Sequence, residues 1–193
     1  MKPVPFDTLT WLNTPQFTTD GDTLTVVTDD DTDFWQKTFY GFVHDNGHFG
    51  YTEVTGDFSL ELSFSAAYDA LYDQAGLMVR FDPETWLKAG VEFTDGLQHL
   101  SVVVTRGASD WSVIPLYTPP DEVRLRVTRL GKAMMLEYAL DLGAFSMLRL
   151  APLTDAPKLH VGVMCCSPKR AGFKVTFRNL KLGVPVSAEL HTS

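Results

Sequence analysis

The stretch from Leu77 to Val104 constrains the fold most, because its apolar residues recur at every second position. Side chains alternate between the two faces of a β-strand, so this period predicts strands that are apolar on one face only. We expect the following apolar residues to face a core: Leu77, Val79, Phe81, Leu87, Ala89, Val91, Phe93, Leu100, Val102 and Val104.

Two turns set the register of these strands. Asp95-Gly96 is the strongest two-residue signal for a type I′ hairpin turn. The earlier turn, around Asp82–Thr85, must hold an odd number of residues if both apolar sets are to face inward. A type I turn followed by a bulge meets that condition. The cross-strand pairs expected from the Asp-Gly turn are Glu92 with His99, Gly90 with Ser101, and Lys88 with Val103.

The opposite face of this meander is polar and carries Arg80, Trp86, Lys88, Glu92, His99 and Ser101. Sugars are bound by flat aromatic rings together with side chains that hydrogen-bond. We therefore expect Trp86 to act as an apolar platform, and Arg80 and Lys88 to pair with an anionic or hydroxylated group. The alternative is a solvated sheet face whose ion pairs contribute about 0–1 kcal/mol each.

Strand patterns continue along the rest of the chain and predict an all-β fold in one domain, residues 1–193. We expect a folded core from about residue 11 to 182 and a loosely held tail over 183–193. Residues 69–74 are predicted as a short helical turn. The further runs that indicate strands are 23–28, 58–64, 123–127, 133–140, 159–166 and 173–177.

Composition excludes several classes of partner. The net charge of -8 without a basic run argues against nucleic acid. No apolar run approaches the roughly 20 residues of a membrane span, and the first residues do not resemble a signal peptide. The only cysteines, Cys165 and Cys166, are adjacent. Two vicinal thiols suit a reducing cytoplasm, and we expect both to be small buried hydrophobes.

Two segments contain groups that often bind metals. His44 and His48 are four residues apart, but Asn46-Gly47 between them favours a hairpin turn, and no third ligand is evident. The loop Asp29–Asp33 is acidic enough to leave calcium open, although it lacks the glycine and final glutamate of an EF-hand. We therefore assign no metal and no cofactor.

Four stretches of the chain, 32–49, 72–93, 100–112 and 161–177, together resemble the DUF1349 family. The most specific motifs are Asp33-Phe34-Trp35, Asp-Gln-Ala-Gly-Leu at 73–77 and Ser109-Asp110-Trp111. The resemblance implies a concanavalin A-like jelly-roll sandwich of two antiparallel sheets. Similar domains occur in β-xylosidases, lectins and glucanases, which implies carbohydrate by analogy of fold.

The functional prediction is a non-catalytic domain that recognises a carbohydrate or a sugar-derived anionic small molecule on the concave sheet. One alternative is a protein that docks a metabolic enzyme, which the resemblance implies because the family includes a protein named as a regulator of enolase. The first candidates for an exposed apolar docking patch are Phe39, Tyr40 and Phe42. The predicted ligand-binding residues are Trp35, His48, Gln74, Arg80, Trp86, Lys88, Glu92, His99, Asp110 and Trp111.

A second alternative is an enzyme that acts on glycosides, which needs two carboxyl groups flanking the scissile bond. Glu92 is the candidate acid, with Asp73 or Asp110 as its partner. We expect Lys88 and Arg80 to keep Glu92 ionised, which does not suit a proton donor. The sequence therefore favours binding over catalysis and leaves an enzymatic activity open.

Overall fold

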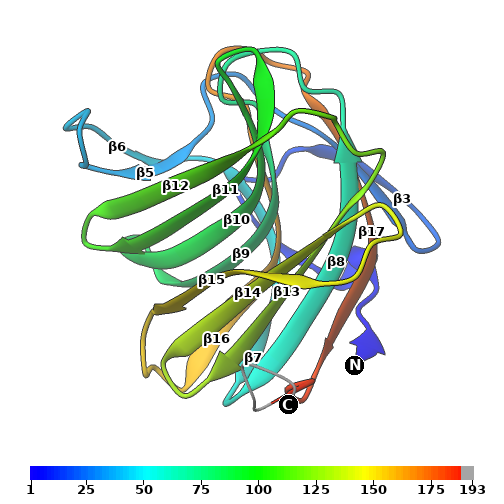
Figure 1. The fold of residues 1–193 in the computed structure, drawn as a ribbon, viewed down its shortest axis with the longest axis vertical. Helices are drawn as coiled ribbons and strands as arrows, with labels where there is room; N and C mark the ends of the chain where they lie inside the picture. Colours follow the sequence, from blue (N-terminus) through cyan, green and yellow to red (C-terminus); the bar gives the residue numbers. More distant parts are fainter. Residues whose placement is uncertain (188–193) are drawn as a thin grey trace.

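The computed structural model describes residues 1–187, and two large antiparallel sheets packed face to face account for nearly all of it (Figure 1). One sheet has eight strands in the order β15-β14-β13-β8-β17-β4-β3, with β1 added at β17. The other has seven strands in the order β12-β11-β10-β9-β16-β7-β2. This arrangement confirms the predicted sandwich of two antiparallel sheets.

The elements are β1 (Lys2–Pro3), the 3-10 helix η1 (Phe6–Thr8), β2 (Thr10–Leu12), β3 (Gln16–Asp20), β4 (Thr23–Val27), β5 (Phe34–Gln36), β6 (Val43–Asp45), β7 (His48–Thr55), β8 (Phe58–Ala66), β9 (Gln74–Asp82), β10 (Thr85–Thr94), β11 (Leu97–Arg106), β12 (Ser109–Leu116), β13 (Val123–Leu130), β14 (Ala133–Leu140), β15 (Ser146–Pro152), β16 (Lys158–Cys166) and β17 (Lys174–Gly183). No helix within residues 1–187 is long and apolar enough to cross a membrane.

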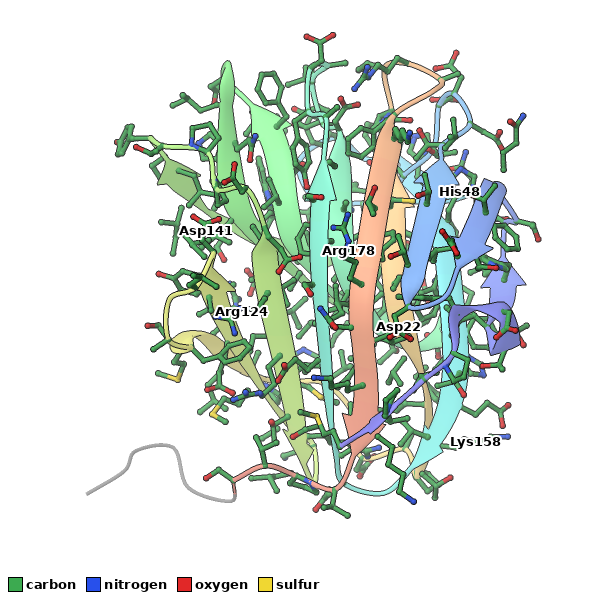
Figure 2. The ribbon with its side chains drawn as sticks, turned by 90° about the vertical axis from the view of Figure 1, so that its right-hand side faces the viewer. Asp22, His48, Arg124, Asp141, Lys158 and Arg178 are labelled. Carbon is green, nitrogen blue, oxygen red and sulfur yellow. The ribbon has the colours of Figure 1, made fainter. Side chains whose placement is uncertain are left out.

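The core lies between the two sheets and takes one face of each. Leu77, Val79 and Leu87 are fully buried in it, as the period-two pattern predicts. The other sheet contributes residues such as Leu62 and Phe177. Figure 2 looks onto the outer face of the eight-stranded sheet, where the polar side chains of the same strands lie.

The register of the β9–β10–β11 meander agrees with the turn chemistry. The three cross-strand pairs expected from Asp95-Gly96 are all present. The β9–β10 connection has the expected odd length, because Trp86 pairs with Arg80 and Thr85 pairs with Asp82. The extra residue in that bulge is Phe81, which is 48% exposed, so its predicted place in the core is wrong.

Two smaller expectations need correction or restriction, and a third is met. Residues 69–73 form an irregular turn and not a helical one, and Gln74 already begins β9. The tail predicted after Gly183 is partly held, because the Val186 amide donates to Ser59 Oγ at 3.0 Å. The remainder of that tail, 188–193, lies outside the described residues. Cys165 and Cys166 are buried and unbridged, as expected.

Candidate functional site

The strands β5 and β6 form a separate two-stranded hairpin that joins neither large sheet. In Figure 1 this hairpin reaches out beside β12, at the left of the molecule. A pocket of ≈ 280 Å³ lies between it and the face of the seven-stranded sheet that points away from the core. Its lining residues are Asp31, Asp33, Trp35, Tyr40, Phe42, His44, Tyr72, Gln74, Lys88, Glu92, Val103, Trp111, Pro168 and Lys169.

Lys88 lies at the base of the pocket and binds the hairpin to the sheet. Its Nζ donates to Asp33 Oδ1 at 3.1 Å, to the Phe34 carbonyl at 2.8 Å and to Gln74 Oε1 at 2.6 Å. Burial alone lowers the pKa of Lys88, but the surrounding negative charges, Asp33 first among them, outweigh burial and raise it. The ammonium is therefore charged, and three protein acceptors use its three donors.

Glu92 forms the second polar centre. Its Oε2 accepts from Ser101 Oγ at 2.7 Å and from Trp111 Nε1 at 3.1 Å. Burial raises the pKa of Glu92, and the opposing effects of Lys88 and Ser101 leave it above its usual value. Of the two cations expected to keep Glu92 ionised, Lys88 does lower its pKa, whereas Arg80 binds Asp45 instead.

Replacing Glu92 by glutamine gives a stability difference whose size depends on pH. A folded-state pKa above the unfolded value, about 4.3, means that the ionised carboxylate destabilises the fold at neutral pH. That penalty disappears as the pH falls through the folded pKa towards the unfolded one. We expect Glu92→Gln to be more stable than wild type at pH 7 in urea denaturation, with the difference shrinking towards pH 4. A variant less stable than wild type at pH 7 contradicts this.

Aromatic rings form the walls of the pocket. Trp35 meets Trp111 edge to face, with centroids 6.3 Å apart, and contacts Tyr40 at 5.8 Å. Tyr40 stacks on Phe42 and shares a hydrogen bond with the Tyr72 hydroxyl at 3.0 Å. That bond, followed by burial, raises the pKa of Tyr72 to about 12. The walls therefore offer apolar ring faces, and the Tyr72 hydroxyl is uncharged at neutral pH.

The predicted residues divide between the pocket and its surroundings. Those that line it are Trp35, Gln74, Lys88, Glu92 and Trp111. Arg80 does not: it forms two hydrogen bonds to Asp45, at 2.6 and 2.8 Å. Trp86 is 0% exposed, packs near Phe34 and donates from Nε1 to the Pro83 carbonyl. Trp86, predicted as the apolar platform, and Arg80, predicted to pair with an anionic group, therefore both contact other residues of the protein and do not line the pocket.

The other predicted residues also lie outside the pocket. His99 is buried and pairs across the strands with Glu92. Asp110 is exposed and binds Arg149 at 2.9 Å. The Asp29 amide donates to His48 Nε2 at 3.0 Å, so Nδ1 carries the proton and donates to the Asn13 carbonyl at 2.6 Å. His48 therefore joins two loops beside β7, near the upper right of Figure 2.

The segment between His44 and His48 is not a hairpin turn, because β6 pairs with β5 whereas β7 begins in the seven-stranded sheet. Its Gly47 is buried, and a Cβ there would come within 2.4 Å of the Phe34 ring. Residues 1–187 contain no group of three or more His, Cys, Asp or Glu side chains placed to hold a metal ion.

Neither partner suggested for Glu92 as a catalytic acid lies in the pocket. Asp73 is fully buried and binds Arg170, and Asp110 binds Arg149. Two other carboxylates do line the pocket: Asp31 is exposed at the rim, and Asp33 accepts from Lys88, Gln74 and its neighbouring amide.

Sequence reasoning missed as pocket residues the loop residues Asp31, Tyr72 and Lys169, and also His44 of β6. They follow no strand period, and only the folded chain brings them together. Asp33 belongs to the Asp-Phe-Trp motif, which was the one signal for this part of the site. Tyr40 and Phe42 had been expected on a protein-docking surface and also line the pocket.

Comparisons with known proteins agree with the fold and with the motifs. The sequence model of DUF1349, described as a protein of unknown function, matches residues 11–185. "Regulation of enolase protein 1" of Saccharomyces cerevisiae is 41% identical over 183 residues, which cover 94% of this chain and 92% of that protein. The crystal structure of a functionally unknown protein from Saccharomyces cerevisiae matches with a TM-score of 0.91 and 39% identity, over 95% of this chain and 100% of that one.

More distant structures share the fold alone. The carbohydrate binding module CBM66 from Bacillus subtilis matches with a TM-score of 0.56 and 14% identity, over 94% of this chain and 98% of that one. A xylan beta-1,4-xylosidase from Bacillus halodurans matches with a TM-score of 0.59 and 15% identity, over 81% of this chain and 33% of that one. Both agree with the sandwich architecture.

Proposed function

The chain belongs to the DUF1349 family, and we propose that it is a binding protein whose pocket beneath the β5–β6 hairpin recognises a small carbohydrate-like molecule. The observation that carries this proposal is the pair of perpendicular indoles, Trp35 and Trp111, beside the Glu92–Ser101 hydrogen bond. Ring faces next to convergent polar groups suit the alternating apolar and hydroxyl surfaces of a sugar.

The size of the pocket supports a small ligand. Its ≈ 280 Å³ lies just below the volumes of about 300–1,000 Å³ that are typical of pockets for drug-sized ligands. The sandwich fold shared with a carbohydrate binding module gives further support by analogy. The proposed setting is the cytoplasm, because both cysteines are free and buried.

A thermal-shift screen of wild type and Trp111→Ala against mono- and oligosaccharides tests this function. A ligand at a hundredfold excess over its Kd stabilises the native state by about 2.7 kcal/mol. For a chain of this size that corresponds to a rise in Tm of about 5–10 °C. We expect such a rise in wild type and its loss in Trp111→Ala. Absence of any rise in wild type across the panel would count against sugar binding.

The second candidate function is docking of a protein partner, favoured by the exposed tip of the same hairpin. Phe39 is 93% exposed and Val43 53% exposed, next to Tyr40 and Phe42. The relative named as a regulator of enolase makes a metabolic enzyme the proposed partner. Pull-down with purified enolase tests this: Phe39→Ser with Val43→Ser should abolish capture, whereas Leu142→Ser, an equally exposed control elsewhere, should not. Equal capture by both variants contradicts docking at the tip.

A further inference from the structure

The positive charges near the pocket are already neutralised by the protein. Lys88 Nζ gives its three hydrogen bonds to Asp33, the Phe34 carbonyl and Gln74. Arg80 lies outside the pocket and binds Asp45 through both terminal nitrogens. The remaining cationic lining residue, Lys169, is exposed at the rim. An anionic ligand group would therefore find no buried cation with a donor to spare.

The negative charge of Glu92, by contrast, faces the pocket. Glu92 is 7% exposed and lines the cavity. Its Oε2 accepts the two hydrogen bonds that the side chain makes, from Ser101 Oγ and Trp111 Nε1. Glu92 Oε1 makes no hydrogen bond to any residue within 1–187, and it is not among the fully enclosed polar atoms that lack a partner. This oxygen is thus not fully enclosed, belongs to a side chain that lines the pocket, and acts only as an acceptor when ionised.

Both amide ends of Gln74 are occupied, which makes Glu92 the main free polar group at the base. Gln74 Oε1 accepts from Lys88, and its Nε2 donates to Asp33. Gln74 therefore positions Lys88 and Asp33 and leaves discrimination between ligands to Glu92. Asp31 adds a further negative charge at the exposed rim.

We propose that the pocket takes a neutral polyhydroxylated ligand, that Glu92 Oε1 accepts a hydrogen bond from one of its hydroxyls, and that Glu92 rejects sugar acids and sugar phosphates. This inference rests on the proposed function and replaces the anionic ligand expected from the sequence. The physical reason is that a second negative charge beside a nearly buried carboxylate meets repulsion that water screens poorly.

The test is isothermal titration calorimetry of the full chain with matched neutral and anionic sugars. The neutral probes are glucose, galactose and xylose, and the anionic probes are glucuronate, galacturonate and glucose 6-phosphate. We expect wild type to bind its preferred neutral sugar at least tenfold more tightly than the corresponding anion. In Glu92→Gln this ratio should fall to threefold or less, because the repulsion is gone while Ser101 and Trp111 still find an acceptor.

Asp110→Asn is the matched control, since it removes a carboxylate of the edge strand β12 that lies outside the pocket. Its selectivity ratio should equal that of wild type. If wild type binds any of the anionic probes more tightly than the neutral sugars, this inference is overturned and the proposed function stands. An unchanged ratio in folded Glu92→Gln overturns the role of Glu92, and absence of binding by all six probes overturns the inference and the proposed function together.

Discussion

Lys88→Ala should lower the free energy of unfolding by about 3–5 kcal/mol, the range for removing one partner of a buried ion pair. The Lys88 side chain is 5% exposed and that of Asp33 is 17% exposed, so the carboxylate would lose its cation where water solvates it poorly. The Phe34 carbonyl and Gln74 Oε1 lose a donor in the same change. Urea denaturation measures the loss directly.

A matched control comes from the other end of the same hairpin. Lys37 binds Glu84 at 2.9 Å, but the two side chains are 53% and 60% exposed. Exposed pairs of this kind contribute about 0–1 kcal/mol, so Lys37→Ala should barely move the transition. If Lys88→Ala stayed within 1 kcal/mol of wild type, about the effect of an exposed pair, Lys88 would not be the group that anchors the hairpin.

Gly90→Ala should cost about 3 kcal/mol or more, because the new methyl group meets backbone that cannot move aside. A Cβ at Gly90 would lie 1.9 Å from the Ala75 carbonyl oxygen, across the β9–β10 ladder. Gly76, its pairing partner, faces the same obstacle at 2.0 Å from the Ala89 carbonyl. Since β10 is paired on both sides, the sheet has no room to open there.

Gly50→Ala provides the comparison for this effect. Its Cβ would meet the Trp11 ring at 3.0 Å, and a side chain adjusts more easily than a backbone carbonyl. We therefore expect a clearly smaller loss of stability, measured by the same denaturation experiment. Equal losses in the two variants would mean that close approach of the β9 and β10 backbones is not what requires glycine at position 90.

The meander could be predicted from the sequence because its determinants are local. Strand period fixes which residues share a face, and Asp95-Gly96 fixes the pairing of Glu92 with His99. Phe81 is the instructive failure, since a bulge must leave one residue out of register and the period does not say which one. Its side chain is left outside the core.

The site was only half predictable, because the hairpin that covers it is held by contacts between distant parts of the chain. Asp33 and Asp45 come from the hairpin and neutralise Lys88 and Arg80, the two cations that sequence reasoning assigned to a ligand. Phe34 packs beside Trp86 and contributes to burying the predicted platform. Strand periodicity shows that these residues face away from the core, but it does not reveal what covers them.

The most direct test of the proposed pocket follows the indole N–H signals in a ¹H–¹⁵N spectrum during titration with the best sugar from the screen. The chain has four tryptophans, and their positions provide an internal control. We predict that Trp35 and Trp111 shift with one common Kd, while Trp11, which packs on Phe17 away from the pocket, stays in place. Signals of Trp35 and Trp111 that stay unmoved at saturating sugar would contradict a ligand site beneath the hairpin.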